Sequence, residues 1–159
     1  MKADNRFRIN VGFLINAPVG EYREFDIDTP FIKIDEDTLF EDVHTVVRVS
    51  RVQQGILVSM KVKAQIELEC VRCLESTSHA VESAFDDLYA FHLRQNIDSD
   101  NYLPEGGVID LEPLLREYLT LEIPISPICK ADCKGLCPEC GANLNLCLCE
   151  HYTHVEQEL

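Results

Sequence analysis

The sequence has no apolar run long enough to cross a membrane. Its longest apolar runs are short, as in VGFLI (Val11–Ile15), whereas a membrane-spanning helix needs roughly 20 apolar residues. The N-terminus combines early positive charge with a short apolar run, but REFDIDTPF follows it in place of a small-residue cleavage site. We therefore expect a mature, cytoplasmic protein with no membrane partner.

Basic residues are also scarce. The chain has 14 Lys and Arg against 28 Asp and Glu, which gives a formal net charge of −14. An acidic surface repels phosphate groups, so charge alone does not favour binding to bare nucleic acid. Basic proteins are the more natural partners, although acidity can also serve solubility alone.

Patterns typical of enzymes are missing. The 5 histidines show no HExxH or comparable spacing, and Gly106-Gly107 predicts a turn instead of a phosphate-binding loop. Asp86 and Asp87 stand near His92, but alternation along a strand would send the two carboxylates to opposite faces. A catalytic zinc ion would keep an open position beside a carboxylate or histidine, whereas the tight spacings here contain only thiols. We expect no enzymatic activity and no small-molecule substrate.

Enough apolar residues are present for a folded core. Hydrophobic residues make up 46% of the chain, which is typical of a folded domain. The length of 159 residues suits one domain with a small appendage. We expect a β-rich domain over residues 1–124 and a Cys-rich, zinc-binding tail over residues 125–159.

Alternating polarity predicts the strands. Apolar and polar residues alternate from Ile56 to Cys70, which is the pattern of a strand with one buried face. The β-branched run Asp42–Val52 precedes it, and Gln53–Gly55 can form the turn of a hairpin. A third strand is expected over His79–Phe91. The segments RFRINVGFLI and YREFDID predict two further strands near the N-terminus.

A single main helix is expected after a polar loop. Residues Gln95–Gly107 are polar, and the apolar residues that follow Asp110 recur at helical spacing. Asp110 is the expected N-cap of a helix over residues 111–123, with Pro113 in its first turn and Pro124 after its end. The predicted fold class is α+β: an antiparallel sheet, one helix and an irregular Cys-rich tail.

Cysteine is the residue that stands out. Six of the 8 cysteines lie in CKADCKGLCPECGANLNLCLCE (Cys129–Glu150). The motifs CVRC (Cys70–Cys73) and CPECG (Cys137–Gly141) have the spacing with which two thiolates reach one tetrahedral zinc ion. In CPECG, the glycine after the second cysteine permits the positive φ that turns the chain away from the metal.

Eight thiols suit one or two structural zinc ions. The predicted ligands are Cys70, Cys73, Cys129, Cys133, Cys137, Cys140, Cys147 and Cys149. One assignment joins the CVRC and CPECG pairs on one ion and leaves the other four cysteines for a second. A rival assignment builds one site within the C-terminal cluster and leaves the CVRC pair separate. Spacing does not choose between them, and His151 or His154 stands close enough to replace a cysteine.

Two other uses of the thiols compete with zinc. Disulfides suit the even count but not the expected cytoplasmic location. A redox dithiol is expected at a helix N-terminus near a βαβ unit, whereas Cys70 and Cys73 end an antiparallel strand. Thiol–disulfide exchange at this pair remains the redox alternative, and it predicts a thiolate that titrates below about pH 7.5.

Direct RNA binding is the other alternative. Its candidate basic stripe consists of Arg48, Arg51, Lys61, Lys63 and Arg72. Lys61 and Lys63 share the expected exposed face of one strand, but no aromatic residue on that face offers a base a stacking surface.

The chain resembles a known family in three segments. ELECVRCLE, VIDLEPLLREYLTLEIPISPICK and CKGLCPECGANLN with its trailing CLC are similar to the YceD family. This is the large ribosomal RNA subunit accumulation protein family, formerly catalogued as a domain of unknown function. The resemblance covers the chain from about Arg48 onward and, weakly, the N-terminal strands.

The resemblance implies a non-enzymatic factor of bacteria and plastids that supports accumulation of large-subunit ribosomal RNA. Family members often neighbour the gene of a small zinc-ribbon protein of the large subunit. Cys70 and Cys73 match the family's C-x-R-C element, and the other six cysteines match its C-terminal cluster. Some members keep the first pair without the cluster, which implies that the cluster braces the fold.

These observations together suggest a factor in ribosome biogenesis. Its expected partner is a precursor of the large ribosomal subunit or a basic ribosomal protein. The carboxylates expected to compete with RNA for such a partner are Glu67, Glu69, Glu75, Asp86 and Asp87.

Overall fold

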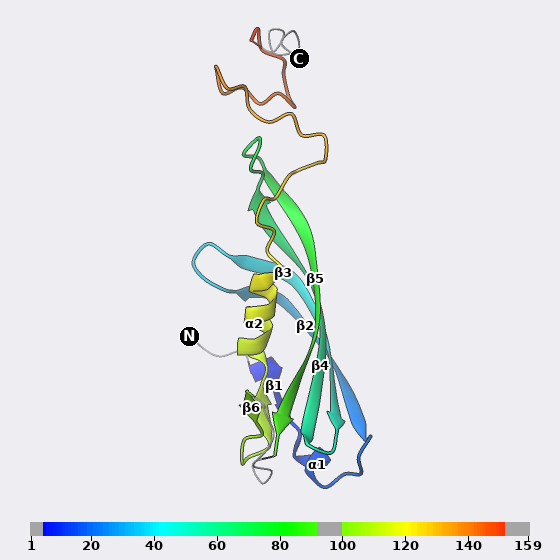
Figure 1. Ribbon diagram of the computed structural model, residues 1–159. Helices are drawn as coiled ribbons and strands as arrows, with labels where there is room; N and C mark the ends of the chain where they lie inside the picture. Colours follow the sequence, from blue (N-terminus) through cyan, green and yellow to red (C-terminus); the bar gives the residue numbers. More distant parts are fainter. Residues whose placement is uncertain (1–4, 92–99, 152–159) are drawn as a thin grey trace. The chain divides into compact units, whose positions relative to one another are not determined.

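The computed structural model describes residues 5–91 and 100–151 (Figure 1). The elements run in the order η1 (Asn5–Phe7), β1 (Arg8–Asn10), α1 (Gly12–Ile15), β2 (Tyr22–Lys33), β3 (Leu39–Arg51), β4 (Gly55–Glu69), β5 (Ser76–Ala90), β6 (Asn101–Tyr102), β7 (Val108–Asp110) and α2 (Glu112–Leu121). Strands dominate and α2 is the main helix, so the predicted α+β class is confirmed.

The chain packs as two compact units. The first contains the described residues of Met1–Gln65 and Ala80–Ile123. The second contains the described residues of Ile66–His79 and Pro124–Leu159. The Cys-rich segment after residue 124 is therefore grouped with the residues that end β4 and begin β5.

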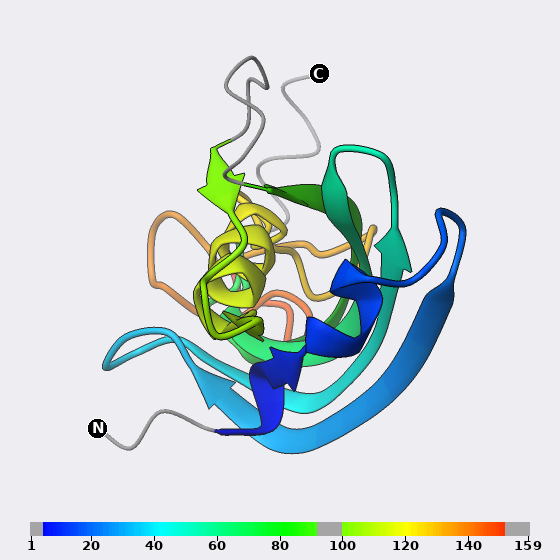
Figure 2. The same ribbon diagram turned by 90° about the horizontal axis from the view of Figure 1, so that it is seen from below.

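Two sheets organise the strands. The main sheet has the order β2-β3-β4-β5-β6, and a small sheet pairs β1 with β7. β2 and β3 pair antiparallel from Tyr22↔Ser50 to Lys33↔Leu39, whereas the short β6 runs parallel to β5. Figure 2 shows the long strands curving around α2.

The alternation predicted for β4 is confirmed. Ile56, Val58, Met60, Val62, Ala64 and Ile66 are all buried, and most of the side chains between them are partly or fully exposed. β3 precedes β4 in the same sheet, as expected for a hairpin. The buried face of β4 supplies a large part of the core, because each buried aliphatic side chain stabilises the fold by about 1.5–3 kcal/mol.

Helix α2 is held against the core by its apolar stripe. Leu115 and Leu119 are fully buried, and the Tyr118 ring stacks on that of Phe85 in β5 with centroids 3.6 Å apart. Leu111, not Asp110, is the N-cap residue. The Asp110 carboxylate still accepts a hydrogen bond from the Glu112 amide at 3.1 Å, so it satisfies one of the free N–H groups at the helix start.

The N-terminal segment differs from its prediction. The expected strand over RFRINVGFLI is divided into η1, β1 and α1. The chain turns because the Asn10 side chain accepts a hydrogen bond from the Gly12 amide at 2.9 Å, an interaction that favours turns over strands. The expected polar loop Gln95–Gly107 contains β6, which was not predicted, and its residues up to 99 lie outside the described part of the chain.

Gly55, the first residue of β4, allows a close approach between backbones. A Cβ atom at this position would overlap the carbonyl oxygen of Tyr89 and stand 2.9 Å from the Cα of Ala90. No rotamer change can relieve this overlap, since the neighbouring atoms belong to the backbone of β5.

We predict that Gly55→Ala lowers the free energy of unfolding by about 1–3 kcal/mol, because β4 and β5 must separate to admit the methyl group. Urea denaturation followed by circular dichroism measures the change. Gly106→Ala is the control, because nothing lies within 4 Å of a Cβ at that position. Equal stability of the two variants would contradict the account.

Candidate metal centres

Four cysteines from two distant segments of the second unit meet in one cluster. Cys70 and Cys73 follow β4, and Cys129 and Cys133 come from the segment after α2; their four Sγ atoms lie within 4.8 Å of one another. The Sγ atoms of Cys70 and Cys133 are 3.8 Å apart, and those of Cys73 and Cys129 are 3.7 Å apart. A tetrahedral zinc ion with Zn–S bonds of about 2.3 Å sets its sulfurs about 3.8 Å apart.

The same distances do not fit disulfides. A disulfide requires about 2.05 Å between sulfurs, and all eight cysteines are free. The first cluster is also largely closed to solvent, since Cys70, Cys73 and Cys133 are buried. Closed four-thiolate geometry is typical of structural zinc sites.

Hydrogen bonds prepare the first cluster to carry negative charge. Burial raises the pKa of the Cys70 thiol, but backbone N–H groups of Cys73, Arg72 and Cys129 outweigh this effect and lower the pKa to about 6. The Asn145 amide donates to the Cys133 sulfur at 3.3 Å and lowers its pKa. Burial and the neighbouring thiols raise the pKa of Cys129 to about 12. Without a cation, these thiols cannot all ionise together.

Backbone contacts fix the two segments against each other. The Val71 amide donates to the carbonyl oxygen of Pro127 at 2.9 Å, and the Leu136 amide donates to that of Arg72 at 3.1 Å. The Arg72 guanidinium donates to the carbonyl oxygen of Cys133 at 3.2 Å. The residues between Cys70 and Cys73 thus bind the segment that supplies the other two thiols.

A second group of four ligand atoms lies in the C-terminal segment. It consists of Cys137, Cys140, Cys149 and His151, again within 4.8 Å of one another. Backbone N–H groups of Cys140 and Glu139 lower the pKa of Cys137 to about 7. Cys137 is buried, but Cys140 and His151 are exposed, so this group is the more open of the two.

The two C-x-x-C turns have the same backbone hydrogen bonds. The Cys70 amide donates a hydrogen bond to the carbonyl oxygen of Glu75 at 2.9 Å. The Cys137 amide donates one to the carbonyl oxygen of Ala142 at 2.8 Å. The amides of Leu74 and Gly141 each donate a hydrogen bond to the carbonyl oxygen of the first cysteine in their turn at 2.9 Å. Both adopt positive φ, 64° for Leu74 and 74° for Gly141. This conformation suits glycine, and it costs other residues roughly 1–2 kcal/mol.

The structure groups the ligands differently from both zinc-ligand assignments that the cysteine spacing suggested. The Cys70–Cys73 pair meets Cys129 and Cys133, not the CPECG pair. His151 joins the second group, and Cys147 is outside both groups, with its Sγ 3.8 Å from the Asn143 oxygen. His154 lies outside the described residues. The spacing of the cysteines holds no signal for this grouping, because it depends on contacts between segments about 60 residues apart.

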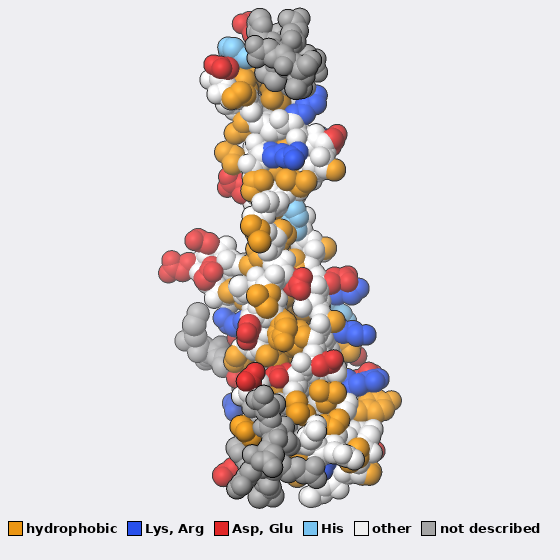
Figure 3. Space-filling view, viewed as in Figure 1, with side chains coloured by type: hydrophobic (Ala, Val, Ile, Leu, Met, Phe, Trp, Pro, Cys, Tyr) orange, Lys and Arg blue, Asp and Glu red, His pale blue; other side chains and the backbone are white. Residues whose placement is uncertain are grey.

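Most cations of the candidate RNA-binding stripe contact other groups of the protein. Arg48 pairs with Glu24 at 2.8 Å, and Lys63 pairs with Glu82 at 3.1 Å. Arg51 stacks on the Phe91 ring, and Arg72 contacts the Cys133 carbonyl group. Over the sheet in Figure 3, Lys and Arg side chains lie beside Asp and Glu side chains. Ion pairs of this kind reduce the positive field that a phosphate backbone would meet.

The acidic residues proposed to compete with RNA are divided between the units. Glu67, Glu69 and Glu75 are exposed in the second unit, and Asp86 is exposed in the first. Asp87 is half-buried; burial raises its pKa, and the Asn101 amide donates to it at 2.6 Å. His92 lies outside the described residues.

Comparison with known proteins gives the family. The model of the family described as "Large ribosomal RNA subunit accumulation protein YceD" matches residues 58–158, a range that contains every cysteine of the chain. The chain belongs to the YceD family. No solved structure matches it.

Proteins that are similar to this chain in sequence come from bacteria and from plants. An uncharacterised protein of Mycobacterium tuberculosis strain H37Rv is 35% identical over 122 residues, which cover 74% of this chain and 58% of the relative. The chain thus spans a little over half of that protein. A chloroplastic large ribosomal RNA subunit accumulation protein YCED homolog 1 of Arabidopsis thaliana is 43% identical over 53 residues, 33% of this chain and 16% of the relative. The Zea mays protein of the same name is 40% identical over 62 residues, 35% of this chain and 21% of the relative.

We predict that each ligand group binds its own zinc ion. Native mass spectrometry of the reduced protein should find two zinc ions in the wild type and one in Cys133→Ser, because three ligands hold the metal much less tightly. Cys147→Ser is the control and should retain two ions, since Cys147 lies outside both groups. One ion in the wild type, or loss of an ion in Cys147→Ser, would contradict the grouping.

Removal of metal should loosen the second unit selectively. With a chelator, we expect faster hydrogen exchange at the amides of Leu74, Leu136 and Gly141, because repulsion between the thiolates then opposes the turns that hold them. Amides in the β2–β3 ladder should keep their protection. Hydrogen-exchange mass spectrometry measures both, and uniform protection with and without metal would argue against a structural role for zinc.

Proposed function

We propose that this protein is a non-enzymatic factor in biogenesis of the large ribosomal subunit. It supports accumulation or processing of large-subunit ribosomal RNA, and it acts where large subunits assemble. The observation that carries the proposal is the YceD family match over residues 58–158. The names of the chloroplastic relatives, which state accumulation of large-subunit ribosomal RNA, support the same role.

The charge of the chain favours a protein as its direct partner. Its 28 acidic and 14 basic residues would repel bare RNA but attract the cationic surface of a ribosomal protein before that surface meets RNA. The pairing of Arg48 with Glu24 and of Lys63 with Glu82 adds to this argument, because each of these cations has a carboxylate beside it that would also meet an approaching phosphate. We therefore propose a basic ribosomal protein, alone or within an assembly intermediate, as the partner.

Zinc in this proposal has a structural role. In the two ligand groups, Cys70, Cys73, Cys129 and Cys133 would hold one ion, and Cys137, Cys140, Cys149 and His151 would hold the other. The lowered Cys70 pKa of about 6 is one observation that favours the redox alternative. Reactive cysteines are partly exposed, however, whereas Cys70 is fully buried. Its thiolate is better explained as a metal ligand.

Sedimentation tests the proposed function. Zinc-loaded, tagged protein should migrate with precursors of the large subunit in a sucrose gradient and dissociate as salt rises, because charge pairs are screened. Ribonuclease treatment of the isolated complex should leave a basic ribosomal protein bound. The proposal is wrong if the tagged protein stays at the top of the gradient and retains no ribosomal protein.

A further inference from the structure

Leu74 occupies the position in its C-x-x-C turn where the matching turn has Gly141. The two turns share their hydrogen bonds and their positive φ, so glycine would fit at residue 74 with less strain. Residue 74 is nevertheless a leucine, and its side chain is 56% exposed. Neither burial nor turn geometry explains a leucine here, and strained residues of this kind are concentrated at functional sites.

Leu74 is accompanied by a second exposed apolar residue. Val71, two residues before Cys73, is 53% exposed, and its amide is held by the carbonyl oxygen of Pro127. Backbone hydrogen bonds of Val71 and Arg72 to the segment after α2 fix the turn, and zinc bound by Cys70 and Cys73 would fix it further. The two apolar side chains are therefore presented on a rigid support, which lowers the entropic cost of binding a partner.

Three acidic residues lie close to this apolar pair in the sequence. Glu67, Glu69 and Glu75 are all exposed and lie within Ile66–His79, the first of the two segments of the second unit. The one Arg in this segment, Arg72, donates to the Cys133 carbonyl oxygen. An apolar pair flanked by carboxylates complements a partner that has apolar side chains among Lys and Arg.

We propose that Val71 and Leu74, with Glu67, Glu69 and Glu75 beside them, form the docking surface for a basic protein segment that inserts an apolar side chain between its cations. This inference deepens the proposed function, on which it rests, by placing the contact with the ribosomal protein at the first metal-bound turn. Arg72, which lies between the two apolar residues in the sequence, is exposed, but it is the one Lys or Arg of Ile66–His79, and the three carboxylates of this segment outnumber it.

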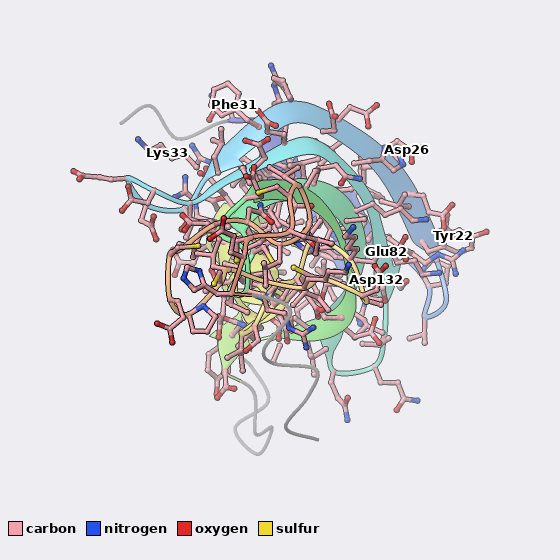
Figure 4. The ribbon with its side chains drawn as sticks, turned by 90° about the horizontal axis from the view of Figure 1, so that it is seen from above. Tyr22, Asp26, Phe31, Lys33, Glu82 and Asp132 are labelled. Atoms are coloured by element: carbon pink, nitrogen blue, oxygen red, sulfur yellow. The ribbon has the colours of Figure 1, made fainter. Side chains whose placement is uncertain are left out.

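Substitution at Leu74 separates binding from folding. Leu74→Gly relieves the strained φ, and Leu74→Asn keeps a side chain that tolerates this conformation but removes its apolar character. Both variants should keep two zinc ions and a melting temperature no lower than that of the wild type. Phe31→Ala is the matched control, because Phe31 on β2 is also 56% exposed and points outward in Figure 4.

The probe is total protein extracted from purified large ribosomal subunits. Immobilised, zinc-loaded wild type should retain a basic ribosomal protein that mass spectrometry identifies. Titration with that purified protein should give a Kd about tenfold weaker for both Leu74 variants, as expected for an anchor side chain. Phe31→Ala should bind as the wild type does.

The possible failures can be told apart. If the wild type binds a ribosomal protein and both Leu74 variants bind it equally well, this docking surface is wrong while the proposed function stands. Loss of zinc from Leu74→Gly would show that the leucine supports the metal site, and would also overturn the docking surface. If the wild type retains only ribosomal RNA, or no ribosomal component at all, the docking surface and the choice of a protein partner are both overturned.

Discussion

Repulsion among closely spaced thiolates is the constraint on which the second unit depends. Four sulfur atoms lie within 4.8 Å in the first group, and backbone amides already favour the ionised form of Cys70. A bound dication turns this repulsion into attraction, because it neutralises thiolates that burial would otherwise keep protonated. Among its described residues the unit has little regular structure besides the ends of β4 and β5, so we expect bound metal to replace much of the apolar core that a larger domain would have.

The first unit is stabilised in the ordinary way, by apolar burial between a sheet and a helix. Residues such as Ile56, Met60 and Leu115 are fully buried, and the stacked rings of Phe85 and Tyr118 join β5 to α2. β4 and β5 each contribute residues to both units, so the strands that supply core residues also lead into the turn that holds Cys70 and Cys73. With metal bound at this turn, one hairpin would combine two sources of stability.

Local sequence patterns predicted the parts of the structure that local physics determines. The period of two in β4 and the helical spacing in α2 follow from which face each element buries, and both elements were found with boundaries close to those expected. The pairing of β1 with β7 was not predictable, since it joins Arg8 to Asp110 and neither strand has more than three residues. The presence of thiol sites could be inferred from C-x-x-C spacing. Their grouping could not, because it depends on long-range contacts such as that between Val71 and Pro127.

The most direct measurement of the central claim is X-ray absorption spectroscopy at the zinc edge on protein that carries two ions. The two ligand groups contain seven sulfurs and one imidazole nitrogen, so the account predicts an average of about 3.5 sulfurs and 0.5 nitrogen per ion, with Zn–S distances of about 2.3 Å. The imidazole signal should disappear in His151→Ala. A spectrum with four sulfurs per ion and no nitrogen, unchanged in that variant, would contradict the account by placing Cys147 in the second site.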